Sequence, residues 1–152
     1  GDQTAKIWYA ASGACLHTLE GHDGWLQLAV YSPDGQHALI MSNGKTVKIW
    51  RVATGKCLRK LRGHDAWVIS AVYSPDGQHV LTASADQTAK IWRVASGACL
   101  RTLQGHDSWV LSVVFSGDGR HVLTASHDQT AKIWCAASGE CLRTLRGHAK
   151  TV

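Results

Sequence analysis

The feature that most constrains the fold of this chain is a repeat of 42 residues. Gly-His pairs end at His22, His64, His106 and His148, each 42 residues after the one before. Lys-Ile-Trp triplets end at Trp8, Trp50, Trp92 and Trp134 with the same spacing. Residues 64–105 and 106–147 are identical at 31 of 42 positions without a gap. This regularity indicates one supersecondary unit that has been copied several times.

Each unit has the pattern of four short strands. In the clearest unit, strands are predicted at 67–73, 79–84, 88–93 and 99–103, with turns at 74–77, 85–87 and 95–97. The Ser-Pro-Asp-Gly turn combines a proline that presets φ with a glycine that accepts positive φ. No segment keeps helical spacing over ten or more residues. The sequence predicts an all-β chain of four-stranded antiparallel units: a half unit at 2–20, full units at 21–62, 63–104 and 105–146, and the start of a further unit at 147–152.

The composition fits a globular protein outside the membrane. Hydrophobic residues make up 45% and charged residues 18% of the chain. No apolar run approaches the roughly 20 residues that a membrane helix needs. We therefore expect no membrane partner.

A four-stranded sheet of this size needs neighbouring sheets to cover its apolar faces, which favours a radial stack. Gly-His, Ser-Pro-Asp-Gly and Ser-x-Asp-x-Thr-x-Lys-Ile-Trp, repeated every 42 residues, closely resemble the WD-repeat β-propellers. The chain departs from that pattern where Asp should follow each Trp, at Tyr9, Arg51, Arg93 and Cys135. The resemblance implies about 3.5 propeller blades, with a ring closed by flanking repeats or by oligomerisation.

The resemblance also implies structural tetrads of hydrogen-bonded side chains inside the blades. By position, these are His64, Ser84, Asp86 and Trp92 in one unit and His106, Ser126, Asp128 and Trp134 in the next. A buried indole N–H and a buried imidazole each need a partner, so such a network would rigidify the blade. The unit between His22 and Trp50 has Gly44 in place of the Asp, and we expect it to be the loosest blade.

Neither catalysis nor metal binding is favoured. The His–Ser–Asp set recurs in each unit with a Trp, and no Gly-x-Ser-x-Gly turn exposes a nucleophile, so we assign no catalytic residue. Cys15, Cys57, Cys99 and Cys141 occur once per unit, and no Cys-x-x-Cys pair suggests zinc. We expect them to be small apolar residues packed between blades, without disulfides, in a reducing cytoplasmic compartment. No metal or cofactor is predicted.

The net charge of +5 raises the possibility of nucleic-acid binding. The basic residues follow the repeat, however, with Arg59, Arg101 and Arg143 on successive fourth strands. The fourth strand is the outermost in such blades, so these residues should be spread along the rim. We interpret them as a solvated rim that protects the strand edges.

The loops at one end of the sheets are the predicted binding face for a protein or peptide. They carry Trp25, Trp67 and Trp109, which repeat, and Asn43, Ala85 and His127, which vary between copies. The tryptophans could anchor a partner. Alternatively, each could pack on the neighbouring blade as a repeated structural residue.

The sequence therefore predicts a non-catalytic protein–protein interaction scaffold that forms a homo-oligomer, a dimer being favoured, to close the ring. Two alternatives remain open: nucleic-acid binding through the basic rim, and a purely structural or engineered self-assembling fragment without a native ligand.

Overall fold

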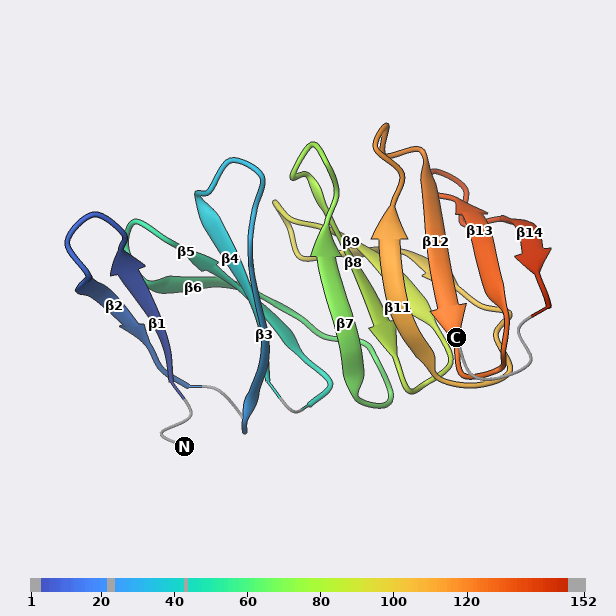
Figure 1. Cartoon of the computed structure of the whole chain (residues 1–152), viewed down its shortest axis with the longest axis horizontal. Helices are drawn as coiled ribbons and strands as arrows, with labels where there is room; N and C mark the ends of the chain where they lie inside the picture. Colours follow the sequence, from blue (N-terminus) through green and yellow to red (C-terminus); the bar gives the residue numbers. More distant parts are fainter. Residues whose placement is uncertain (1–3, 22–23, 43, 148–152) are drawn as a thin grey trace.

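The computed structural model describes residues 4–21, 24–42 and 44–147 and is built from β-strands alone over these ranges (Figure 1). A two-stranded sheet is followed by three four-stranded antiparallel sheets, each a simple meander. The strands are β1 (Ala5–Tyr9) and β2 (Ala14–Leu19); β3 (Leu26–Tyr31), β4 (His37–Ser42), β5 (Val47–Arg51) and β6 (Lys56–Leu61); β7 (Val68–Tyr73), β8 (His79–Ser84), β9 (Ala89–Arg93) and β10 (Cys99–Leu103); and β11 (Val110–Phe115), β12 (His121–Ser126), β13 (Ala131–Cys135) and β14 (Cys141–Leu145).

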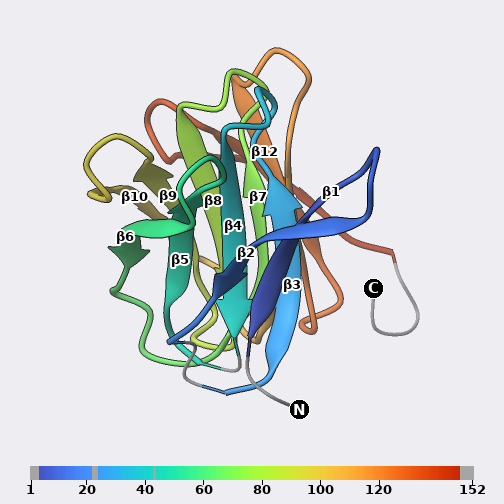
Figure 2. The ribbon, with the colours of Figure 1, turned by 90° about the vertical axis from the view of Figure 1, so that its left-hand side faces the viewer.

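The sheets stand face to face, one behind another, as the view from the β1–β2 end shows (Figure 2). The predicted all-β architecture of four-stranded, blade-like sheets is thereby confirmed, and the sheets form an open stack. Within the described residues, no helix is long and apolar enough to cross a membrane.

The turn between the first and second strands is closed by a serine and an aspartate. Ser74 Oγ donates to Asp76 Oδ1 at 2.5 Å, and the same carboxylate oxygen accepts the Gln78 backbone N–H at 2.9 Å. The Ser74 hydroxyl also accepts the His79 N–H at 2.9 Å. These bonds, the Ser74 bond first, lower the pKa of Asp76. The turn residues thus fix the hairpin that sequence alone predicted.

The hydrophobic cores lie between the sheets. Leu81, Ile91 and Leu103 on one face of the second four-stranded sheet pack against Val110, Val122 and Trp134 of the third. The first and second four-stranded sheets bury an equivalent cluster, and Ile7 and Leu19 of the β1–β2 sheet pack against Ile40 and Trp50. Each sheet therefore covers an apolar face of its neighbour, as the repeat argument requires.

Among the described residues, no second sheet covers the outward face of the last sheet. Leu123 and Leu145 are 39% and 43% exposed, whereas their repeat counterparts Leu81 and Leu103 are 0% and 1% exposed beneath the third sheet. Residues that form a core elsewhere in the chain thus present an apolar surface here.

The expectation that the cysteines pack between blades is met in part by Cys57, which packs against the cluster of Ile7, Leu19, Ile40 and Trp50, and is wrong for the other three. Cys15, Cys99 and Cys141 are exposed and Cys57 is partly exposed, and none forms a disulfide. They lie at the start of the outermost strand of each sheet, where Cys99 Sγ is 3.4 Å from the Arg101 carbonyl oxygen of its own strand. The position of Cys15, Cys99 and Cys141 at the sheet margin leaves these three thiols exposed.

Candidate functional site

The second and third four-stranded sheets each contain a buried network of four side chains. His64 Nδ1 lies 2.7 Å from Asp86 Oδ2, and His64 Nε2 lies 2.7 Å from Thr82 Oγ1. The Trp92 indole donates to the same hydroxyl at 2.9 Å. The third sheet repeats these contacts in His106, Asp128, Thr124 and Trp134, with the same distances.

The predicted serine members of the tetrads were wrong. Ser84 does not contact the imidazole: its hydroxyl donates to the Ala66 carbonyl oxygen at 3.3 Å and accepts the Asp86 backbone N–H at 3.1 Å. Ser126 makes the equivalent bonds to Ser108 and Asp128. The serines thus hold the loop, while the threonines two residues earlier join imidazole and indole.

Donor and acceptor accounting assigns the protons of this network. Trp92 N–H donates to Thr82, so the threonine hydroxyl can donate its own proton to His64 Nε2, and His64 Nδ1–H then donates to the Asp86 carboxylate. Burial lowers the pKa of His64 and outweighs the opposing effect of Asp86. Burial alone would raise the pKa of Asp86, but hydrogen bonds from Thr88 and His64 lower it overall. The pair is a neutral imidazole beside a carboxylate.

An Asp–His–hydroxyl relay has the order of groups found in hydrolases, but a substrate cannot reach this one. Thr82 and Trp92 are buried, and the His64 side chain is 1% exposed. The Thr82 hydroxyl oxygen also accepts a hydrogen bond from the Trp92 indole N–H, so this oxygen does not face a substrate. Across the described residues, no cluster of three or more His, Cys, Asp or Glu side chains could hold a metal ion. The geometry suits rigidity of the sheet rather than chemistry.

The first four-stranded sheet has lost two members of the network. Ile40 stands at the repeat position of Thr82, and Gly44 stands at that of Asp86. Ile40 packs with Trp50 in an apolar cluster, and the buried Lys48 Nζ donates to the Gly21 carbonyl oxygen. His22 lies outside the described residues, so the expected looseness of this blade stays a prediction.

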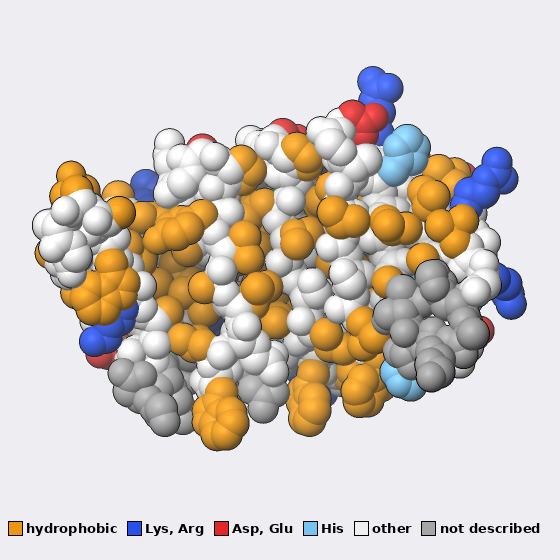
Figure 3. All heavy atoms as spheres, viewed as in Figure 1, with side chains coloured by type: hydrophobic (Ala, Val, Ile, Leu, Met, Phe, Trp, Pro, Cys, Tyr) orange, Lys and Arg blue, Asp and Glu red, His pale blue; other side chains and the backbone are white. Residues whose placement is uncertain are grey.

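The candidate binding surface lies at the end where β3, β7 and β11 begin, on the lower side of Figure 1. Trp25, Trp67 and Trp109 immediately precede these strands and are 77%, 59% and 51% exposed. Figure 3 shows bulky hydrophobic side chains projecting along this lower margin. The tryptophans are therefore not packed into the cores between sheets. We call these three residues the tryptophan row.

The variable loop residues lie directly beside the tryptophan row. The Ala85 backbone N–H donates to the Trp67 carbonyl oxygen at 2.9 Å, and His127 N–H donates to Trp109 in the same way. Ala85 is partly exposed and His127 is exposed. Asn43, the third of the variable positions, lies outside the described residues. The chain thus brings a repeated aromatic residue and a variable residue together in two successive sheets.

Sequence reasoning missed a contact at the outer rim that joins neighbouring sheets. Arg59 of β6 donates from Nε and Nη2 to the Ala95 carbonyl oxygen, at 3.1 and 2.7 Å, in the third-to-fourth-strand turn of the next sheet. Arg101 bonds Ala137 at 2.8 Å in the same way, and His17 bonds Ala53 at 3.1 Å. The signal was the 42-residue spacing of positions 17, 59 and 101. We call these contacts the rim clasps.

A glycine with positive φ makes room for each rim clasp. Gly97 has a φ of +75°, and a Cβ there would lie 3.4 Å from Arg59 Cδ. At Gly139, with a φ of +78°, a Cβ would lie 3.3 Å from Arg101 Cδ. The glycines of these turns therefore serve both the tight turn and the close approach of the arginine from the neighbouring sheet.

The family model described as "WD domain, G-beta repeat" matches residues 13–51, 55–93 and 97–135, which is more than half of the chain. The chain belongs to the WD40 repeat family. Each matched WD40 repeat begins on the fourth strand of one sheet and ends with the third strand of the next. A WD40 repeat therefore spans two blades, and its rim clasp joins the same two blades.

Curated relatives match over about one WD40 repeat. Nuclear distribution protein nudF of Aspergillus flavus is 49% identical over 45 residues, which is 30% of this chain and 10% of that protein. Nuclear distribution protein PAC1 of Cryptococcus neoformans is 51% identical over 35 residues, 23% of this chain and 8% of that protein. Lissencephaly-1 homolog 1 of Paramecium tetraurelia is 44% identical over 45 residues, which is 30% of this chain and 11% of that protein. The chain thus aligns with about a tenth of the length of these relatives.

Proposed function

We propose that this chain is a non-catalytic scaffold that binds a protein or peptide through the tryptophan row and the loop residues beside it. The proposal rests on the exposure of Trp25, Trp67 and Trp109, which lie at the same end of the strands in three successive sheets. An indole has a large apolar surface and loses little conformational entropy when it is covered, so aromatic residues are common anchors at interfaces.

The variable residues supply specificity in this proposal. Ala85 and His127 adjoin Trp67 and Trp109 through backbone hydrogen bonds, and Asn43 is their repeat counterpart. The sheets beneath, which are joined by the cores between them, would present these loops in a fixed geometry. Relatives named as nuclear distribution proteins support a role in an assembly rather than in a reaction.

The alternatives receive less support. The guanidinium groups of Arg59 and Arg101 are engaged in rim clasps, which argues against a rim of free cations that follows a nucleic acid. A purely structural or engineered chain without a ligand gives no reason for three exposed indoles at the same end of the strands in successive sheets.

The test is a quantitative pull-down from a cell extract with the wild-type chain, Trp67→Ala and Trp109→Ala. The control is Leu16→Ala, because Leu16 is another exposed apolar residue away from the tryptophan row. We expect both tryptophan variants to lose most of the recovered partner, while the control keeps it. Equal recovery by all four proteins would remove the proposed site.

We further propose that the chain forms a homo-oligomer, most simply a dimer, in which a blade of a second copy covers the outward face of β11–β14. The exposure of Leu123 and Leu145 supports this, because the same repeat positions are buried wherever another blade follows. Arg143 is the repeat counterpart of Arg59 and Arg101 and would clasp that second copy. We also propose a cytoplasmic location, where the five free cysteines would stay reduced.

A further inference from the structure

A groove of about 790 Å³ opens between the second and third four-stranded sheets, at the end opposite to the tryptophan row. It is lined by the turn at Gly119 and Arg120, the beginnings of β8 and β12 and the end of β9. Its volume is in the range of sites that hold small ligands or peptide side chains. The groove is thus a second surface, separate from the one proposed above.

The groove combines an apolar floor with a basic border. Ile91, Leu100 and Phe115 form part of the lining and offer apolar surface. Arg93, Arg101 and Arg120 also line it, together with two histidines, and no carboxylate is among the lining residues. An occupant of this groove should therefore carry both apolar and anionic groups.

Two of the arginines are available for a ligand. Arg101 is engaged in its rim clasp, but the side chains of Arg93 and Arg120 are exposed and form no hydrogen bond or ion pair with any residue that the structure describes. Asp118, which accepts hydrogen bonds from Ser116 and from the Arg120 backbone N–H, also interacts electrostatically with Arg120 and offsets part of its charge, whereas Arg93 has no such neighbour among the lining residues. Glu140 is not among the lining residues, which therefore carry an excess of positive charge.

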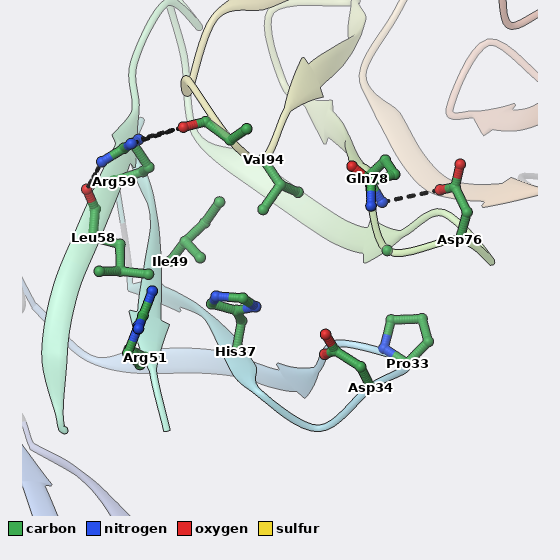
Figure 4. Close-up of a pocket in the computed structure, with 12 residues that line it drawn as sticks. Pro33, Asp34, His37, Ile49, Arg51, Leu58, Arg59, Asp76, Gln78 and Val94 are labelled. Carbon is green, nitrogen blue, oxygen red and sulfur yellow. Dashed lines mark hydrogen bonds between the residues drawn. The ribbon is translucent and has the colours of Figure 1, made fainter. Parts of the chain in front are cut away.

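The equivalent groove between the first and second four-stranded sheets has a different chemistry and serves as an internal reference (Figure 4). Gln78 takes the place of Arg120 there, and Asp34 and Asp76 are among the lining residues. In Figure 4, Asp34 lies beside Pro33 at the margin, across from His37 and Arg51. Asp34 and Asp76 are the repeat counterparts of Asp76 and Asp118 beside the other groove, so the difference in charge between the two grooves is Arg120 in place of Gln78.

We propose that the groove between β7–β10 and β11–β14 binds an acidic peptide segment that inserts a bulky apolar side chain. The apolar side chain would cover Phe115 and Leu100, and flanking carboxylates would pair with Arg93 and Arg120. The arginine guanidinium binds carboxylates in a bidentate fashion, which gives the site both affinity and orientation.

A peptide fits this groove better than a nucleic acid does. A phosphate backbone needs a continuous row of cations, whereas these arginines surround one hollow with an apolar floor. Local charge complementarity therefore favours a short acidic segment with an apolar centre.

Fluorescence anisotropy with a labelled hexapeptide, Asp-Glu-Leu-Phe-Glu-Asp, tests the proposal on the whole chain at a fixed protein concentration. We expect the Arg93→Gln/Arg120→Gln double variant to bind this peptide about tenfold more weakly, because two charge pairs are lost. Arg120→Gln alone introduces the residue that the reference groove already carries, so it should fold normally and bind a few times more weakly. Arg51→Gln, in the reference groove, and Trp67→Ala, in the tryptophan row, should bind like the wild type.

Two control ligands separate the sources of binding. A peptide with the acids replaced by amides, and one with Leu-Phe replaced by Ala-Ala, should each bind at least about fivefold more weakly. The proposal is overturned if the double variant binds the peptide as tightly as the wild type, or if the amide peptide binds equally well. It is also overturned if a labelled single-stranded oligonucleotide binds more tightly than the peptide and displaces it.

Discussion

The threonine hydroxyl at position 82 is the centre of the best-defined side-chain network in the molecule. It accepts a hydrogen bond from the Trp92 indole and forms another with His64, which is in turn hydrogen-bonded to Asp86. The four groups are satisfied by one another and lie out of contact with solvent or nearly so. Such a network stabilises one arrangement of the sheet, because losing any member leaves a buried polar group without a partner.

We predict that Thr82→Val lowers the free energy of unfolding by about 1–3 kcal/mol, because the indole and imidazole lose their shared partner in a buried site. Thr82→Ser keeps the hydroxyl and should lower the free energy of unfolding by a smaller amount. Urea denaturation followed by tryptophan fluorescence measures both variants. An equal loss for valine and serine would mean that the methyl group, not the hydroxyl, matters.

The network also predicts acid sensitivity. Burial lowers the pKa of His64 in the folded chain, so the unfolded chain, with a histidine pKa of about 6.5, takes up the proton first. Stability from this residue is fully present above that pH and is lost as the pH falls below it. The free energy of unfolding should be lower at pH 5.5 than at pH 7.5, and His64→Gln should reduce the difference. His121→Gln, at an exposed position, should leave the difference unchanged; a pH difference untouched by His64→Gln would contradict the assignment.

The sequence identified three of the four network members but could not choose the hydroxyl. Thr82 and Ser84 are two residues apart on β8 and so face the same side of the sheet. Only the register, which places Thr82 opposite Lys90 and Val80 opposite Trp92, brings the threonine under the indole. That register depends on the pairing of whole strands and is not visible in the spacing of single residues.

At the scale of the strands and turns, the first four-stranded sheet differs from the other two. Its β4 has Ile40 where the others have a threonine, and the following turn has Gly44 where the others have an aspartate. Ile40 packs with Trp50 in an apolar cluster in place of the hydrogen-bonded threonine, and Gly44 has no side chain to replace the aspartate. The hydrogen bonds that the threonine and the aspartate supply in the other two sheets are therefore absent from the described part of this one.

We predict that backbone amides of β4 and β5 exchange with deuterium faster than those of β8 and β9. The matched control is β12 and β13, which lie in an end sheet but keep the full network. Their protection should be close to that of β8 and β9, because the network and not the position in the stack decides it. Protection of β4 and β5 equal to that of the control strands would contradict this explanation.

Turns and strands were predictable because their signals are local, whereas contacts between sheets were not. Ser74, Asp76 and Gly77 close their hairpin within a few residues, and the strands follow. The rim clasps join residues 36 positions apart, and the cysteines lie at the sheet margin because of how the sheets are stacked. Neither placement follows from a pattern along one strand.

At the scale of the whole molecule, the two proposed binding surfaces lie at opposite ends of the strands, and the outward face of β11–β14 is uncovered among the described residues. The tryptophan row lies at one end of the strands, and the basic groove lies at the other. A scaffold with both could hold two partners at once. The uncovered face of β11–β14 would join copies of the chain without using either surface.

The claim on which the account rests is that each sheet needs another blade against its apolar face. Sedimentation equilibrium of the purified chain tests this most directly, with Leu142→Glu/Leu145→Glu as a variant that places charges on the uncovered face. We predict a mass near twice 16.4 kDa for the wild type at micromolar concentration and a monomer for the variant. A wild-type chain that stays a stable 16.4 kDa monomer at every concentration would contradict the account.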